Sequence, residues 1–179
     1  KATGIVRRID DLGRIVIPKE IRRTLRIREG DPLEIFTDRE GKVILKKYSP
    51  IGELGTLAGI YADSLSKTLD CTVCITDTDQ GIAAAGNGKK ELQEMLLSAE
   101  LAEVFQERKT VLKKSSDAEF VAITKDRSEY SEEIISVILS EGDIAGGVIF
   151  LQKNEKKHFG EMEKKFAAGA ADLLGRQLS

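Results

Sequence analysis

Short runs of β-branched and apolar residues, interrupted by turn residues, occupy the first 49 positions of the chain. Asp, Gly and Pro supply the turns, and Pro18 stands where a helix can begin because its missing N–H is not needed there. Ile21 and Leu25 lie four residues apart on the helix face that we expect to be buried. The pattern predicts, in chain order, a hairpin of strands at 4–9 and 14–17, a helix from 18 to about 25, and strands at 33–37 and 43–47.

After a connector at 50–55, broken by Pro50, Gly52 and Gly55, the hydrophobic pattern has a longer period. It predicts amphipathic helices at 57–69 and 159–174, and helical structure at 89–107 as one helix or two shorter ones. A polar loop is expected from Lys125 to Glu133. The strands expected in this part are 73–76, 82–85, 120–124, 134–139 and 144–151. A sheet flanked by helices at both ends of the segment is an α+β arrangement.

Residues 1–49 are too few to bury an adequate core, and units of this size rely on disulfides, metals or oligomerisation. This segment contains no cysteine and no visible cluster of metal ligands. We therefore predict an obligate dimer in which strands from two chains share one barrel-like core. The expected domains are 1–49 and 56–179, joined by the linker 50–55.

The chain of 179 residues is 41% hydrophobic and 32% charged, a composition typical of a folded protein. Its net charge of −2 hides a division along the sequence. Residues 1–49 carry 13 Lys and Arg against 8 Asp and Glu, a balance of +5, and the remainder has a balance of −7. A basic first domain predicts binding to a polyanion.

Other features exclude several classes of protein. No stretch approaches the roughly 18 apolar residues of a membrane span, and the chain does not open with a signal-peptide core. Two cysteines and one histidine argue against a disulfide framework, a histidine-based metal site and a catalytic triad. We expect a cytoplasmic protein with no catalytic residues, metal or cofactor.

The first domain resembles the AbrB-type swapped-hairpin DNA-binding domain of bacterial transition-state regulators. The likeness is carried by residues 3–8 (TGIVRR), 11–18 (DLGRIVIP), 20–25 (EIRRTL), 33–35 (LEI) and 44–48 (ILKKY). The whole chain is similar to sporulation transcription factors in which such a head precedes a GAF-like domain. The resemblance implies an all-β swapped-hairpin (AbrB-like) N-terminal domain plus an α+β GAF-like C-terminal domain, acting on double-stranded DNA at the nucleoid.

Five arginines match the positions with which members of this family bind DNA. The arginine fork suits phosphate oxygens and the guanine edge. Adjacent residues in a strand point to opposite faces, so we rank Arg8 below Arg14 and the pair Arg22–Arg23. The candidate DNA-binding residues are Arg7, Arg8, Arg14, Arg22 and Arg23.

For the second domain, the resemblance implies a small-molecule ligand and self-association through terminal helices. Two self-associating domains would give a tetramer. The residues carry no ligand signature. Turn chemistry accounts for Asp77, Asp79 and Gly81, a bulge or hairpin accounts for Gly146 and Gly147, and His158 is expected at the surface.

Three interpretations follow. The first is a DNA-binding regulator of sporulation genes, with activation or repression left open. The second is a swapped-hairpin antitoxin, whose toxin-binding tail would be disordered. The third is a GAF-fold thiol redox enzyme that uses Cys71 and Cys74. Cys74 falls in a predicted strand, and residues three apart there point to opposite faces, so both cysteines are expected to be small apolar fillers.

Overall fold

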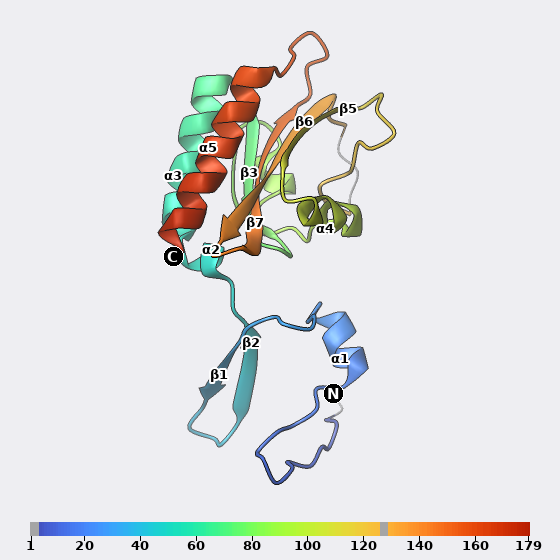
Figure 1. Ribbon diagram of the computed structural model, residues 1–179, viewed down its shortest axis with the longest axis vertical. Coiled ribbons are helices and arrows are strands. Elements are labelled where there is room, and N and C mark those ends of the chain that lie inside the picture. Colours follow the sequence, from blue (N-terminus) through green and yellow to red (C-terminus); the bar gives the residue numbers. More distant parts are fainter. Residues whose placement is uncertain (1–3, 126–128) are drawn as a thin grey trace. The chain divides into compact units, whose positions relative to one another are not determined.

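The computed structural model describes residues 4–125 and 129–179, which form two compact units, Lys1–Tyr48 and Ser49–Ser179 (Figure 1). The first unit contains α1 (Lys19–Thr24) and the antiparallel strands β1 (Leu33–Thr37) and β2 (Val43–Lys47). These bounds confirm the predicted helix and the second predicted pair of strands. Pro18 lies at the position that caps α1, as its fixed φ favours.

The first predicted hairpin is the main difference in this unit. Residues 4–9 and 14–17 flank a turn at 10–13 but form no β-ladder, and Ile21 and Leu25 are exposed. The physical reason is the lack of a surface to pack on, because a two-stranded hairpin alone is marginal in water. Among residues 4–48, only Pro18 is buried.

The connector expected at 50–55 is folded and belongs to the second unit. Pro50 begins a short helix, α2 (Pro50–Glu53), and α3 (Gly55–Leu69) follows at once. The Ser49 hydroxyl accepts a hydrogen bond from the Gly52 N–H at 3.1 Å, and Ile51 has an exposed fraction of 0%. Proline therefore starts a helix here where we expected it to interrupt structure.

The second unit is built on a five-stranded antiparallel sheet in the order β4-β3-β7-β6-β5. Helices α3 and α5 lie side by side and antiparallel on one face, and α4 lies on the other (Figure 1). This arrangement confirms the α+β expectation. The remaining bounds are β3 (Thr72–Thr76), β4 (Gly81–Ala85), a 3-10 turn at Lys89–Glu91, α4 (Ala99–Gln106), β5 (Thr110–Lys114), β6 (Glu132–Ser140), β7 (Asp143–Gln152) and α5 (Glu161–Gln177).

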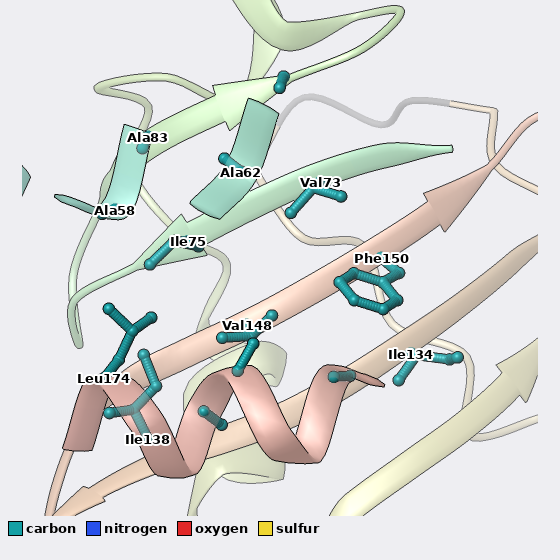
Figure 2. Close-up of a cluster of buried hydrophobic side chains, with 14 of the residues drawn as sticks. Ala58, Ala62, Val73, Ile75, Ala83, Ile134, Ile138, Val148, Phe150 and Leu174 are labelled. Atoms are coloured by element: carbon teal, nitrogen blue, oxygen red, sulfur yellow. The ribbon is translucent and has the colours of Figure 1, made fainter. Parts of the chain in front are cut away.

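Small residues of α3 face the sheet in the core on the α3–α5 side. Ala58 and Ala62 lie over β3 and β4, in one buried cluster with Val73, Ile75 and Ala83 (Figure 2). The leucines and tyrosine expected on the buried face of this helix are only half-buried and lie beside the contact. Small residues let the helix axis approach the sheet closely, and the larger side chains pack against the edge of the same cluster.

The core on the α4 side contains Phe105, whose ring packs directly on the backbone of Gly147. A Cβ at Gly147 would come within 2.7 Å of that ring, so the contact requires glycine. The register of β6 and β7 shifts next to Gly146, where Ile138 faces Gly146 but Leu139 faces Ile144. The two glycines therefore belong to a bulged hairpin, as predicted.

Three elements in the middle of the second unit differ from the prediction. Strand β5 was not expected, and its lysines suit a sheet edge. Residues 89–107 divide into the 3-10 turn and α4. Residues 120–124 are not a strand and make a single bridge, from Thr124 to Leu97. The expected loop 125–133 lies partly outside the described residues, at 126–128, and its last two residues belong to β6.

Candidate nucleic-acid interface

A tight loop at Asp10–Arg14 joins the arms of the first predicted hairpin. The Asp10 carboxylate oxygen Oδ1 accepts hydrogen bonds from the N–H groups of Leu12 at 3.0 Å and Arg14 at 2.8 Å. The backbone closes the loop from Asp10 N–H to the Arg14 carbonyl at 3.0 Å. Gly13 has φ +75°, a conformation that glycine adopts without strain. The loop is thus fixed by its own residues.

The loop at Asp38–Lys42, between β1 and β2, has the same construction. Asp38 Oδ1 accepts from the N–H groups of Glu40 at 2.9 Å and Lys42 at 2.8 Å. Its backbone closes from Asp38 N–H to the Lys42 carbonyl at 3.1 Å, and Gly41 has φ +80°. Each loop therefore follows the pattern Asp-x-x-Gly-Arg/Lys and ends in a cationic residue.

The side chain of Arg14 is bonded through its Nε to the loop in which it lies. Its Nε donates to Asp10 Oδ2 at 2.7 Å, while the Arg14 side chain keeps an exposed fraction of 71%. The backbone N–H and the guanidinium of Arg14 hold the pKa of Asp10 below its ordinary value. Sequence reasoning used Asp10 only as a turn residue, although the repeated Asp-x-x-Gly spacing is visible in the sequence.

The five candidate arginines occupy three places in the first unit, and all are exposed. Arg22 and Arg23 are adjacent in the last turn of α1, Arg14 ends the first loop, and Arg7 and Arg8 precede that loop. Among the described residues, Arg14 alone of the five forms an ion pair. The other four guanidinium groups are available to an anionic ligand.

The turn between β3 and β4 holds its polar residues in local bonds. Asp77 Oδ1 accepts from the N–H groups of Asp79 and Gln80, both at 2.7 Å, and its Oδ2 accepts from the Ser49 hydroxyl at 2.9 Å. Gly81 is required by close approach, since a Cβ there would lie 2.0 Å from the Leu92 carbonyl oxygen. Turn chemistry therefore explains Asp77, as expected, whereas Gly81, expected as a turn residue, belongs to β4 and is required by close packing.

The two cysteines are buried on opposite sides of the sheet, Cys71 in the core with α3 and Cys74 in the core with α4. Burial raises the pKa of both thiols to about 12, so neither is a thiolate near neutral pH. His158 is exposed, as expected, and its Nδ1 lies 2.6 Å from the buried carboxylate of Glu132.

Glu133 is a buried carboxylate that the sequence analysis did not single out. Its side chain is on the α4 side of the sheet, where Oε1 accepts from the Val121 N–H at 2.9 Å. Within the described parts of the chain, Oε2 has no hydrogen-bond partner. Burial raises the pKa of Glu133 to about 7, against the opposing effects of the Val121 N–H and the charge of Lys113.

An apolar groove runs between α3 and α5 on the side of these helices that faces away from the sheet. Its volume is about 790 Å³. Large apolar side chains line it and remain exposed, with fractions of 57% for Ile60, 60% for Met162 and 52% for Leu173. Phe166, exposed by 42%, lies among them.

Residues 4–125 and 129–179 contain neither a cluster of metal ligands nor a membrane-spanning helix. No group of three or more His, Cys, Asp or Glu side chains is placed to hold a metal ion. No helix there has the length and hydrophobicity needed to span a bilayer.

Two protein families match the chain, and their matches meet at residue 53, a few residues after the boundary between the two units at Tyr48. Residues 53–179 match the family described as stage V sporulation protein T C-terminal, transcription factor. Residues 6–53 match the family described as antidote-toxin recognition MazE, bacterial antitoxin.

Similar proteins cover the whole chain and each part. Stage V sporulation protein T of Bacillus subtilis is 50% identical over 99% of this chain and 98% of its own length. The transition state regulatory protein AbrB of the same organism is 66% identical over 28% of this chain and 51% of its own. The GAF domain of an Acinetobacter phosphoenolpyruvate-protein phosphotransferase superposes with a TM-score of 0.59 at 14% identity, covering 74% of this chain and 84% of that one, which shows a shared fold.

Proposed function

The chain belongs to the stage V sporulation protein T family of transcription factors, and we propose that it binds duplex DNA through Arg7, Arg8, Arg14, Arg22 and Arg23. Its membership makes it a DNA-binding regulator of sporulation genes and not an enzyme. The AbrB-like head and GAF-like fold agree with the architecture that the sequence indicated.

The observation that carries the assignment of the site is the set of five exposed arginines, four of which form no ion pair within the described part of the chain. An arginine that forms no ion pair within the protein can bind a phosphate and release its counterions without first breaking an internal salt bridge. Arg22 and Arg23 project from one helix end, and the Arg14 terminal nitrogens are free of the contact made by its Nε. Residues 1–28 carry seven Arg and two Lys against three acidic residues, which concentrates positive charge in this part of the unit.

We propose that the first unit is completed by a second copy of itself. Both faces of the β1–β2 hairpin carry exposed apolar side chains, with Ile35 opposite Leu45 on one face and Phe36 opposite Ile44 on the other. Burial of such a side chain stabilises a fold by about 1.5–3 kcal/mol. Interleaved hairpins from two chains would cover both faces. They would also give residues 4–9 and 14–17 the neighbouring strands with which to form hydrogen bonds.

The experiment that tests the DNA site compares Arg14→Ala and the double change Arg22→Ala with Arg23→Ala. The DNA is a duplex that the parent protein selects from a random pool. We expect each variant to bind this duplex at least about tenfold more weakly, because the loss of an arginine contact costs about 1–3 kcal/mol. Electrophoretic mobility shift measures the affinity. Thermal melting should stay within a few degrees, since these side chains are exposed.

Arg39→Ala is the matched control, because it removes one exposed charge from the other loop. If all variants retarded DNA as the parent does, the proposed site would be wrong. If Arg39→Ala weakened binding as much as Arg14→Ala, only overall charge would matter.

The antitoxin interpretation is favoured by the MazE match of residues 6–53 but fails on the rest of the chain. It requires a disordered tail after the head, whereas residues 49–179 form a sheet with two packed faces. Redox catalysis fails because both thiols are buried and separated by the sheet, with pKa values near 12.

We further propose that the groove between α3 and α5 receives the same two helices of a second copy. Two amphipathic helices lying antiparallel form half of a four-helix bundle. The helices carry charges of both signs near the groove, such as Asp63 with Lys67 and Lys164 with Glu161, which suits a self-complementary two-fold contact. Self-association by both units makes a tetramer.

The GAF-like unit is proposed to tune DNA binding at the nucleoid in response to a small molecule. Native mass spectrometry of the purified protein tests this together with the tetramer, because it reports the assembly mass and any co-purified ligand. A mass of four bare chains would support the assembly and argue against a resident ligand.

A further inference from the structure

The two loops of the first unit have the same backbone but leave their cationic residues in different states. In the first loop a single carboxylate oxygen, Asp10 Oδ2, holds one of the three guanidinium nitrogens of Arg14. In the second loop the Lys42 ammonium lies 3.4 Å from Asp38 Oδ2 and also bonds the carboxylate of Glu40. The Lys42 ammonium is a single point charge, and in this loop it is shared between two carboxylates.

From this difference we infer that Asp10 is a positioning residue for DNA recognition, which holds the Arg14 guanidinium by Nε so that its two terminal nitrogens face the ligand. The role rests on the proposed binding of DNA by Arg14. The equivalent residue of the second loop, Asp38, has no such role, because a lysine ammonium is a point charge without the planar donor pair of a guanidinium.

The chemistry of the guanidinium supports this division of its donors. The group is planar and has five N–H donors, one on Nε and four on the two terminal nitrogens. Once Nε is used, the terminal edge still offers the donor pair that fits a guanine edge or a phosphate. A carboxylate bound to Nε therefore fixes the plane of the guanidinium and leaves its terminal nitrogens free to bind DNA.

The loop itself fixes the carboxylate. Asp10 Oδ1 is held by the N–H groups of Leu12 and Arg14, so Oδ2 is placed by the same turn that places Arg14. An arginine side chain free in water loses much rotamer freedom when it binds. Arg14 has lost part of that freedom before DNA arrives, which favours a defined contact over a diffuse one.

Simple electrostatics predicts the opposite consequence of removing this carboxylate, and that opposition makes the inference testable. A negative charge beside a DNA-binding residue repels phosphates, so its loss should tighten binding to every duplex. Loss of a positioning residue should instead weaken binding to a preferred duplex relative to others.

The test uses the full chain with Asp10→Asn. The asparagine oxygen still accepts from both backbone N–H groups and preserves the turn, but its amide nitrogen cannot accept from Arg14 Nε. Asp38→Asn makes the same change in the matching loop and serves as the control. Fluorescence anisotropy measures the affinity of each for a duplex selected by the parent and for the same duplex scrambled.

We expect Asp10→Asn to lower the ratio of selected to scrambled affinity by about tenfold, the loss expected when one base contact is misplaced, while Asp38→Asn leaves the ratio unchanged. In the Arg14→Ala background, Asp10→Asn should have no further effect on the ratio. A purely structural role for Asp10 would lower it in both backgrounds.

An unchanged ratio in Asp10→Asn, or equal losses in both asparagine variants, would overturn the inference. The proposed site fails separately, since in that case Arg14→Ala itself would bind the selected duplex like the parent.

Discussion

Glu133 is a charged residue inside an apolar layer, with an exposed fraction of 0% and a single hydrogen bond to its carboxylate. Burial favours its neutral form and raises its pKa to about 7, from 4.5 in an unstructured chain. The folded state therefore binds the proton more tightly than the unfolded state does. Stability is highest when the group is protonated in both states and falls as the pH rises through the interval between these two pKa values.

We expect Glu133→Gln to remove this pH dependence. Relative to the variant, the parent should lose up to about 3 kcal/mol of unfolding free energy between pH 4.5 and pH 7, since each pKa unit corresponds to about 1.4 kcal/mol. Urea unfolding at several pH values measures the difference. Glu103→Gln, on the exposed side of α4, is the control. A parent–variant difference that stays constant from pH 5 to 8 would contradict the prediction.

At the scale of elements, α5 is docked on the sheet through a glycine. A Cβ at Gly175 would lie 2.1 Å from the carbonyl oxygen of Leu139 on β6, too close for any side chain. Gly59 in α3 has nothing within 4 Å of the same position. The first glycine permits a helix-to-strand contact, and the second only lowers the helix propensity of α3.

The same substitution should therefore have opposite effects in the two helices. Gly175→Ala is expected to destabilise the second unit by about 1–3 kcal/mol, because backbone must shift to admit the methyl group. Gly59→Ala is expected to stabilise it by up to about 1 kcal/mol through helix propensity. Thermal unfolding followed by circular dichroism compares them. Equal destabilisation by both variants would show that the contact at Leu139 is not what requires glycine.

At the scale of the whole molecule, the protein exposes two separate apolar surfaces, and the proposed tetramer buries both. The first unit exposes both faces of its hairpin, and the second exposes the groove between α3 and α5. Since the surfaces belong to different units, each one can be disrupted without the other.

In the proposed tetramer, Phe166→Glu is expected to separate the α3–α5 contact and leave a dimer, because it places a charge among the apolar side chains of the groove. The dimer should still bind DNA, since the arginines and the hairpin faces are unaltered. Sedimentation velocity gives the mass, and Ala168→Glu, exposed on α5 outside the groove, is the control. A monomeric Phe166→Glu variant, or one that remains tetrameric, would refute the proposed division of interfaces.

Most elements could be predicted from local patterns. The short apolar runs of β1 and β2, the bulge at Gly146 and the amphipathic period of α5 all follow from residues close in sequence. The exposure of Arg14 and of the Arg22–Arg23 pair also followed, because charged side chains in a segment too short to form its own core stay at the surface.

The sequence by itself determined the two-part organisation, the basic head and the types of most helices and strands, because propensity and charge are properties of neighbouring residues. Tertiary structure decided the rest. In the folded chain, Ala58 and Ala62 are the fully buried apolar residues of α3, and its leucines are only half-buried. Glu133 is buried in the sheet, and residues Pro50–Glu53 form a helix of the second unit. These outcomes depend on which surfaces meet across the fold, and no local pattern carries that information.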